Sequence, residues 1–97
     1  MRRAARVDSN QREIVTALRK AGYQVQHLHM VGDGCPDILV GAHGNNILIE
    51  LKDGNKKPSA RRLTEDERQW HESWAGQVDV ANDFGECIEI ILRETRR

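Results

Sequence analysis

The sequence predicts an α/β fold, a mixed central β-sheet flanked by helices, in one domain that spans residues 1–97. Apolar residues recur every three or four positions in residues 9–21 and 63–75, which is the spacing of one helix face. Two short apolar runs, at 38–40 and 47–51, are separated by a segment rich in turn-forming residues, which indicates a pair of strands. A chain of 97 residues is near the small end of what buries an adequate core alone, so one domain is expected.

The first helix is expected over residues 9–21, because its apolar residues share one face: Ile14, Val15, Leu18 and Ala21. Gly22 follows at the position where glycine commonly ends a helix. A strand is expected next, over residues 23–30. Val25 and Leu28 do not alternate strictly there, so the pattern leaves the register of this strand open.

The two central strands come next. The first begins at Asp37, directly after Pro36, and proline suits the start of a strand because it has no N–H to donate to a neighbour. Glycine and asparagine in residues 41–45 suit a turn into the second strand. In that strand alternate side chains share a face, so Glu50 and Lys52 project from the same face. Ile49 and Leu51 project from the opposite face. Antiparallel pairing of the two runs brings Asp37 close to Glu50.

The rest of the chain predicts a helix over residues 63–75, a strand over 77–81 and a final helix over 84–92. The last segment is apolar enough to serve as a strand. The spacing of Asp83 and Glu86 resembles a capping box, however, and favours a helix. The complete order is αβββαβα.

Asp37, Glu50 and Lys52 form the candidate catalytic group. Two adjacent carboxylates repel each other unless a cation lies between them, and a hard divalent ion with oxygen ligands suits that position. Such an ion could activate water and neutralise charge on a phosphate, while the Lys52 ammonium reaches the same phosphate. The alternative is a pair of surface acids on an edge strand, with Lys52 in a simple ion pair.

Basic residues gather directly after this strand: Lys56, Lys57, Arg61 and Arg62. The chain has 15 basic and 15 acidic residues and no net charge, so attraction to nucleic acid has to come from such local clusters. We expect this cluster to bind DNA. The alternative is a solvated loop, since residues 53–60 have the composition of a linker.

Two cysteines, far apart and without CxxC spacing, suggest neither a zinc site nor a redox motif. Neither a membrane span nor the apolar core of a signal peptide is visible in the sequence. We therefore expect a soluble protein of the cytoplasm, in a bacterium or a phage-infected host cell.

Pro36-Asp37 followed by Glu50-x-Lys52 resembles the PD-(D/E)xK nuclease signature. The wider frame, which includes Gly34, Leu63-Thr64 and Trp70, resembles the VRR-NUC domain, a virus-type replication-repair nuclease. This resemblance covers roughly residues 8–92. It implies a restriction-endonuclease-like core, DNA as substrate, Mg²⁺ or Mn²⁺ as cofactor, and a catalytic role for Lys52.

Glu13 matches the place where related junction-resolving nucleases carry an extra acid, so the resemblance implies a third metal ligand. Asn10 and Glu13 also have capping-box spacing, which would make Glu13 part of a helix start.

Glu67 stands where the family usually has glutamine. It shares a helical face with Leu63, Trp70 and Trp74, so it is expected to point inward. Either a capping box with Thr64 or a place in the active-site pocket would explain it. Trp70 and Trp74 are expected in the core, the alternative being stacking on unpaired bases.

The function that these patterns predict is a metal-dependent DNA endonuclease. Its stand-alone relatives are similar to homodimeric resolvases, which implies a homodimer that cuts four-way (Holliday) junctions. The alternatives are a nuclease for flap, nicked or duplex DNA, or a non-catalytic nucleic-acid-binding or assembly module on the same fold.

Overall fold

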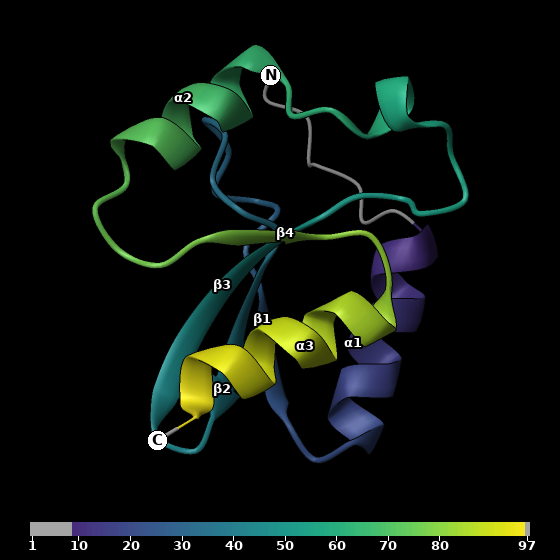
Figure 1. The fold of residues 1–97 in the computed structure, drawn as a ribbon, viewed down its shortest axis with the longest axis vertical. Coiled ribbons are helices and arrows are strands. Elements are labelled where there is room, and N and C mark those ends of the chain that lie inside the picture. The colour runs from purple at the N-terminus through teal and green to yellow at the C-terminus, as the bar shows by residue number, and fades with distance from the viewer. Residues whose placement is uncertain (1–8, 97) are drawn as a thin grey trace.

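A computed structural model describes residues 9–96 of the protein (Figure 1). The elements are α1 (Ser9–Lys20), β1 (Gln24–His27), β2 (Ile38–Ala42), β3 (Asn45–Leu51), a 3-10 helix η1 (Pro58–Arg61), α2 (Glu65–Ser73), β4 (Asp79–Ala81) and α3 (Phe84–Thr95). The predicted order of helices and strands is confirmed, with η1 as an addition that begins within the segment expected to be a linker.

The four strands form one mixed sheet in the order β1-β2-β3-β4. The first three are antiparallel neighbours, and β4 runs parallel to β3. Ile38 pairs with Ile49 and Leu39 with Leu48. This register continues beyond the ladder to place Asp37 opposite Glu50, as the sequence predicted.

The core lies between one face of the sheet and the two helices α1 and α3, which both pack on that face (Figure 1). The buried strand positions alternate, as expected for a sheet with one covered face: Ile38, Val40, Ile47, Ile49 and Leu51. From the helices, Leu18, Cys87 and Ile91 are fully buried against them. The other face of the sheet carries Leu39, Leu48, Glu50 and Lys52.

Helix α1 ends as predicted at glycine. Gly22 has a φ of 101°, a left-handed conformation that glycine adopts without strain. The N–H of Tyr23 donates to the carbonyl of Leu18, and the N–H of Gly22 to that of Arg19, which is a Schellman motif. The chain is thereby turned directly into β1.

Two strands are shorter than predicted. The strand expected over 23–30 ends at His27, because a loop with left-handed backbone at Gly32, Asp33 and Gly34 follows it. The strand expected over 77–81 starts only at Asp79. The side chain of Gln77 takes the place of a strand residue, because its amide accepts from the N–H of Leu48 and donates to the carbonyl of Leu48, both at 2.8 Å.

The last two helices also differ from prediction. Helix α2 covers Glu65–Ser73 rather than 63–75, and Thr64 caps its start. Helix α3 runs to Thr95, beyond the predicted end, and Asp83 caps it by accepting from the N–H of Glu86. None of the helices in residues 9–96 is long and apolar enough to span a bilayer.

The expectation that Trp70 and Trp74 belong to the core is wrong. Helix α2 contains no fully buried residue, and Trp74 remains 46% exposed. The helical spacing correctly put both rings on one side of α2. That side faces the second, open face of the sheet rather than the core between the sheet and α1 and α3.

Candidate active site

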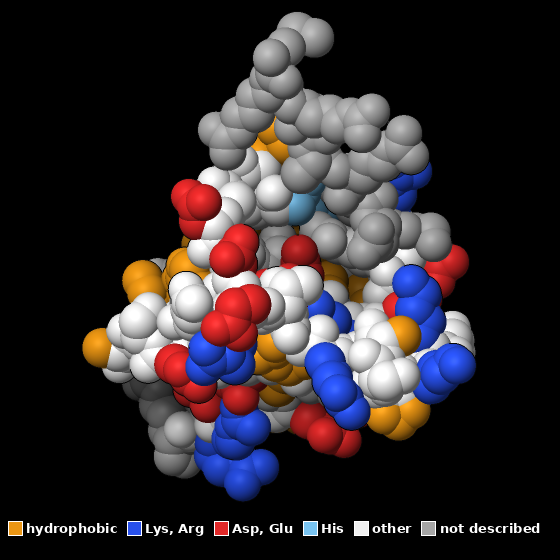
Figure 2. Space-filling view, turned by 90° about the horizontal axis from the view of Figure 1, so that it is seen from above, with side chains coloured by type: hydrophobic (Ala, Val, Ile, Leu, Met, Phe, Trp, Pro, Cys, Tyr) orange, Lys and Arg blue, Asp and Glu red, His pale blue; other side chains and the backbone are white. Residues whose placement is uncertain are grey.

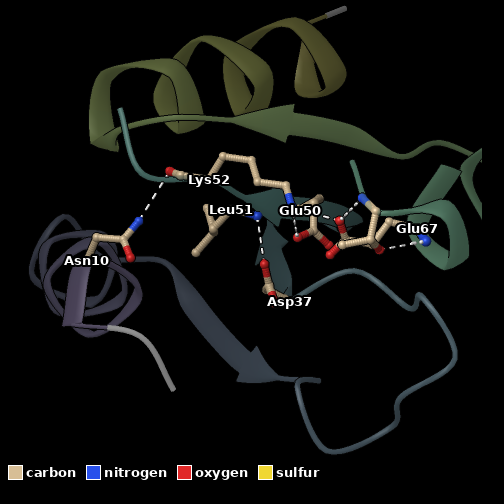
Figure 3. A network of polar contacts seen from close by, with 7 residues as sticks. Asn10, Asp37, Glu50, Leu51, Lys52 and Glu67 are labelled. Atoms are coloured by element: carbon tan, nitrogen blue, oxygen red, sulfur yellow. Dashed lines mark hydrogen bonds and ion pairs between the residues drawn. The ribbon is translucent and has the colours of Figure 1, made fainter. Parts of the chain in front are cut away.

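Asp37 and Glu50 meet at the end of the β2–β3 pair. The side chain of Asp37 is held in place because its Oδ2 accepts from the N–H of Leu51 at 2.8 Å. Glu50 lies on the neighbouring strand and is only 2% exposed. Figure 3 shows both carboxyl groups directed toward the same space as the Lys52 ammonium. The structure therefore brings together the three residues that the sequence proposed as catalytic.

Burial is the main reason that the pKa of Glu50 is raised far above its ordinary value, to about 10. Hydrogen bonding to Asp37 and the negative charge of Asp37 raise it further. Among the described residues, no group hydrogen-bonds to Glu50 Oε1, although this oxygen is buried. This buried oxygen can therefore accept a hydrogen bond or bind a cation.

Lys52 provides a positive charge beside this acid. Its Nζ lies 3.7 Å from Glu50 Oε2 and 2.7 Å from Glu67 Oε1. Burial acts to lower the pKa of Lys52, but the hydrogen bond to Glu67 and the negative charges of Glu67 and Asp37 outweigh burial and raise the pKa. Lys52 is therefore charged at neutral pH and can stabilise negative charge.

Glu67 forms the expected capping box with Thr64 and also contacts Lys52. Its backbone N–H donates to the Thr64 hydroxyl, and the Thr64 N–H donates to Glu67 Oε1 at 2.8 Å, so the capping box is complete. The same Oε1 accepts from Lys52. Burial acts to raise the pKa of Glu67, but the hydrogen bonds from Lys52 and Thr64 hold it below the usual range. The start of α2 and the position of Lys52 thus depend on one carboxylate.

The loop before Asp37 packs directly on α2. Gly34 has a φ of 82°, and a Cβ there would lie 2.2 Å from the Asp66 carbonyl oxygen. Only glycine allows this approach without displacing backbone. The close contact positions the first turn of α2, and with it Glu67, over the end of β3.

Glu13 does not join this cluster. It is exposed and lines a separate cleft of about 280 Å³ together with Asp53 and Asn82. The predicted capping box is also wrong, because Asn10 lies inside α1 and its side chain donates to the carbonyl of Lys52. Within residues 9–96, three acids, histidines or cysteines never gather closely enough to form a complete metal shell.

The basic cluster lies next to the site, on the segment that leads from β3 to α2. Lys56, Lys57 and Arg62 are exposed and Arg61 is half-buried. None of the four forms an ion pair with another residue of the described chain. Figure 2 shows several basic side chains on the side of the molecule where η1 lies. These charges are available to an anionic partner.

Two further residues border the site without an assigned role in the sequence pattern. His71 lies one helical turn after Glu67, and its buried Nε2 has no partner within residues 9–96. The pKa of Cys35 is raised by burial and then by the charges of Glu50 and Asp37. The spacing of four between Glu67 and His71 was the signal that could have placed the histidine here.

The donor set fits a hard divalent cation. Asp37 and Glu50 offer carboxylate oxygens, the ligands that such ions prefer. A cation would also provide a partner for the buried Glu50 Oε1 and would relieve the repulsion between the two acids. Asp37 and Glu50 are the residues that could hold it.

Comparison with known proteins identified a solved structure described as a VRR_NUC domain. It is 29% identical in sequence, the match covers 90% of this chain and 92% of that one, and the TM-score is 0.51. No protein-family model matches the sequence, and no curated protein matches it. The predicted resemblance to the VRR-NUC domain and the predicted α/β fold are confirmed, and the similarity supports a nuclease domain.

Proposed function

We propose that this chain is a metal-dependent DNA endonuclease in which Asp37 and Glu50 hold Mg²⁺ or Mn²⁺ and Lys52 acts at the phosphate. The observation that carries the proposal is the burial of Glu50, 2% exposed, between a second carboxylate and a lysine. A buried acid whose pKa is raised so strongly is costly for folding, and such groups are concentrated at functional sites. The similarity to a VRR_NUC domain supports the same conclusion.

A divalent cation bound at Asp37 and Glu50 would supply Lewis acidity toward the phosphate and toward a water nucleophile. The N–H of Leu51 fixes the Asp37 carboxylate, so one ligand is preorganised. Glu13 lies apart from these two acids, and we therefore propose a shell that does not include it.

Lys52 contributes a fixed positive charge. Its ammonium is anchored to Glu67 and lies close to Glu50, so it can move toward an oxygen of a bound phosphate without a large rearrangement. Negative charge builds up on that phosphate during hydrolysis, and a preorganised cation stabilises it. The basic cluster follows β3 in the chain, and its exposed members Lys56, Lys57 and Arg62 are the residues that we propose bind the DNA backbone beyond the site.

Branched DNA is the substrate that we propose within this class, cut by a homodimer. Two identical sites related by a two-fold axis suit a four-way junction cut on opposed strands. Strand β4 lies at an edge of the sheet, and exposed apolar side chains on it and directly after it offer a surface for association: Val80 and Phe84 are 38% and 36% exposed. A monomeric mass by light scattering at the concentrations used for cleavage would contradict the dimer.

The test is cleavage of labelled four-way junction, flap, nicked, duplex and single-stranded DNA with Mg²⁺, Mn²⁺ or EDTA. We expect metal-dependent cleavage, with the four-way junction preferred, and a loss of at least 100-fold in Glu50→Gln and Lys52→Ala. Titration calorimetry with Mn²⁺ gives a second readout, because Glu50→Gln should lose metal binding even where cleavage is too weak to measure.

Matched controls are available on exposed helix positions. Glu89→Gln on α3 and Lys20→Ala on α1 make the same chemical changes far from the cluster and should cut at the wild-type rate. Cleavage that survives Glu50→Gln and Lys52→Ala would point to another site or another protein. DNA binding without cleavage under every metal would favour the non-catalytic module.

A further inference from the structure

An apolar groove runs along the open face of the sheet, next to the candidate active site. It has a volume of about 440 Å³, within the range of small-molecule sites. Its floor is the directly paired Leu39 and Leu48, and Trp70 and Trp74 of α2 form one wall. Leu48 precedes Glu50 by two residues on the same strand face, so the groove begins about 7 Å along the strand from the buried acid.

The two tryptophans present a flat aromatic surface to this groove. Their rings are stacked, with centroids 4.5 Å apart and planes inclined by 20°. Trp74 is the outer ring, 46% exposed. A Cβ at Gly76 would lie 2.9 Å from Trp74 Nε1, so the following loop packs against the indole edge. The Trp74 ring therefore packs on Trp70 with one face and on the following loop with its edge.

None of the described residues that line the groove carries a charge, so the groove offers a phosphate no charged partner. The outer surface of α2 carries the exposed acids Glu65, Asp66 and Glu72, and Arg68 is paired with two of them. Phosphates are repelled there and attracted instead to the basic cluster beyond Lys52. A flat, apolar group can enter the groove, and in a nucleic acid that group is an unpaired base.

We propose that this groove binds an unpaired nucleobase of the strand that occupies the active site, stacked on Trp74. The proposal rests on the proposed nuclease function and names its substrate more closely: DNA with an unpaired base next to the cleaved bond, as at a branch point or a flap. Stacking on an aromatic side chain accepts any base, so structure rather than sequence is selected.

Tryptophan emission tests the proposal directly, because the chain has only two tryptophans. In Trp70→Phe, all emission comes from Trp74. A twelve-nucleotide oligothymidylate, titrated in EDTA so that no cleavage occurs, should quench this emission. An abasic oligonucleotide of the same length carries the same phosphates and should leave the emission unchanged. Equal quenching by both, or by neither, would overturn the proposal.

Affinity gives a second readout. Trp74→Ala should bind oligothymidylate roughly tenfold more weakly or worse, while binding of fully paired duplex is unchanged. Leu92→Ala, which removes an equally exposed apolar side chain from α3, should change neither affinity. Thermal unfolding verifies that Trp74→Ala is folded.

The same measurements separate this proposal from the proposed function. Wild-type cleavage combined with unchanged oligothymidylate binding in Trp74→Ala overturns base binding alone. Base-dependent quenching in a protein that cuts no DNA with any metal supports base binding and overturns the nuclease. A Trp74→Ala protein that binds DNA normally but changes from dimer to monomer assigns the groove to a second copy of the chain, and also overturns the proposal.

Discussion

At the scale of single residues, Glu50 dominates the site because it is an acid in a position suited to an apolar side chain. Its neighbours in β3, Ile49 and Leu51, are equally buried, and its free oxygen has no partner among the described residues. Without a cation the folded protein keeps a proton on Glu50, since burial and Asp37 raise its pKa to about 10.

Stability in EDTA should therefore fall as pH rises. Between the ordinary pKa of 4.5 and the raised pKa of about 10, the unfolded chain binds fewer protons at Glu50 than the folded chain does, so the free energy of unfolding decreases with pH. Glu50→Gln removes this contribution. We expect this substitution to raise the melting temperature at pH 8 by several degrees. It should also reduce the fall in stability with pH, measured by thermal unfolding from pH 5 to pH 9. An identical pH dependence in both proteins would contradict the raised pKa.

Glu67 is expected to act on activity through Lys52 rather than through helix stability. Thr64→Ala removes the capping hydroxyl and leaves the Lys52 contact intact, whereas Glu67→Ala removes both. Both variants should lose about 1 kcal/mol of stability. Only Glu67→Ala should also lose cleavage, by tenfold or more, and Glu67→Gln should retain the cap. Equal activity losses in Thr64→Ala and Glu67→Ala would show that the helix start alone matters.

At the scale of elements, the loop before β2 and the first turn of α2 form a single unit. Gly34 allows their backbones to touch, so this glycine determines how closely the first turn of α2 packs on the loop. Gly44, in the β2–β3 turn, provides a matched comparison, because its φ of 79° is nearly the same but no atom would lie within 4 Å of an added Cβ.

Gly44→Ala should cost only the strain of a left-handed alanine, about 1 kcal/mol, and keep full cleavage activity. Gly34→Ala adds a backbone collision with Asp66, so we expect a larger loss of stability and a loss of cleavage of tenfold or more as Glu67 leaves Lys52. Denaturant unfolding and initial cleavage rates provide the comparison. Equal effects of the two substitutions would mean that the contact with α2 is unimportant.

The order of elements and the meeting of Asp37 with Glu50 could be predicted from the sequence, because strand alternation and a short turn leave little freedom in register. The exposure of Trp74 could not be predicted, because helical spacing shows which residues share one side of a helix but not what covers that side. The role of the Gln77 amide in place of a strand residue could not be predicted either, because it depends on contact with Leu48, 29 positions earlier. The resemblance implied Glu13 as a metal ligand, but in the structure Glu13 lines a separate cleft.

At the scale of the whole molecule, the net charge is zero, but acidic and basic residues gather in different segments. The totals cancel at 15 basic and 15 acidic residues, yet α2 is acidic while the segment from β3 to α2 is basic. Long-range attraction to DNA is therefore weak, and binding depends on a few local contacts.

Salt dependence measures those contacts. Each lysine that binds a phosphate of duplex DNA contributes about 0.9 to the slope of log K against log salt. Lys56→Ala combined with Lys57→Ala should lower the slope by about 1.8, measured by fluorescence anisotropy between 50 and 200 mM salt in EDTA. Lys20→Ala, on α1, is the control. An unchanged slope in the double variant would place the DNA elsewhere.

Helix α2 buries no side chain completely, and its first turn makes the contacts with Gly34 and Lys52. Segments of this kind open before the rest of a protein unfolds, so the amide hydrogens of α2 should exchange with solvent well ahead of those of β3. Opening would release the Lys52 ammonium from Glu67 while the sheet stays intact. The enzyme should then be inactivated by mild heating at temperatures where circular dichroism still reports a folded protein.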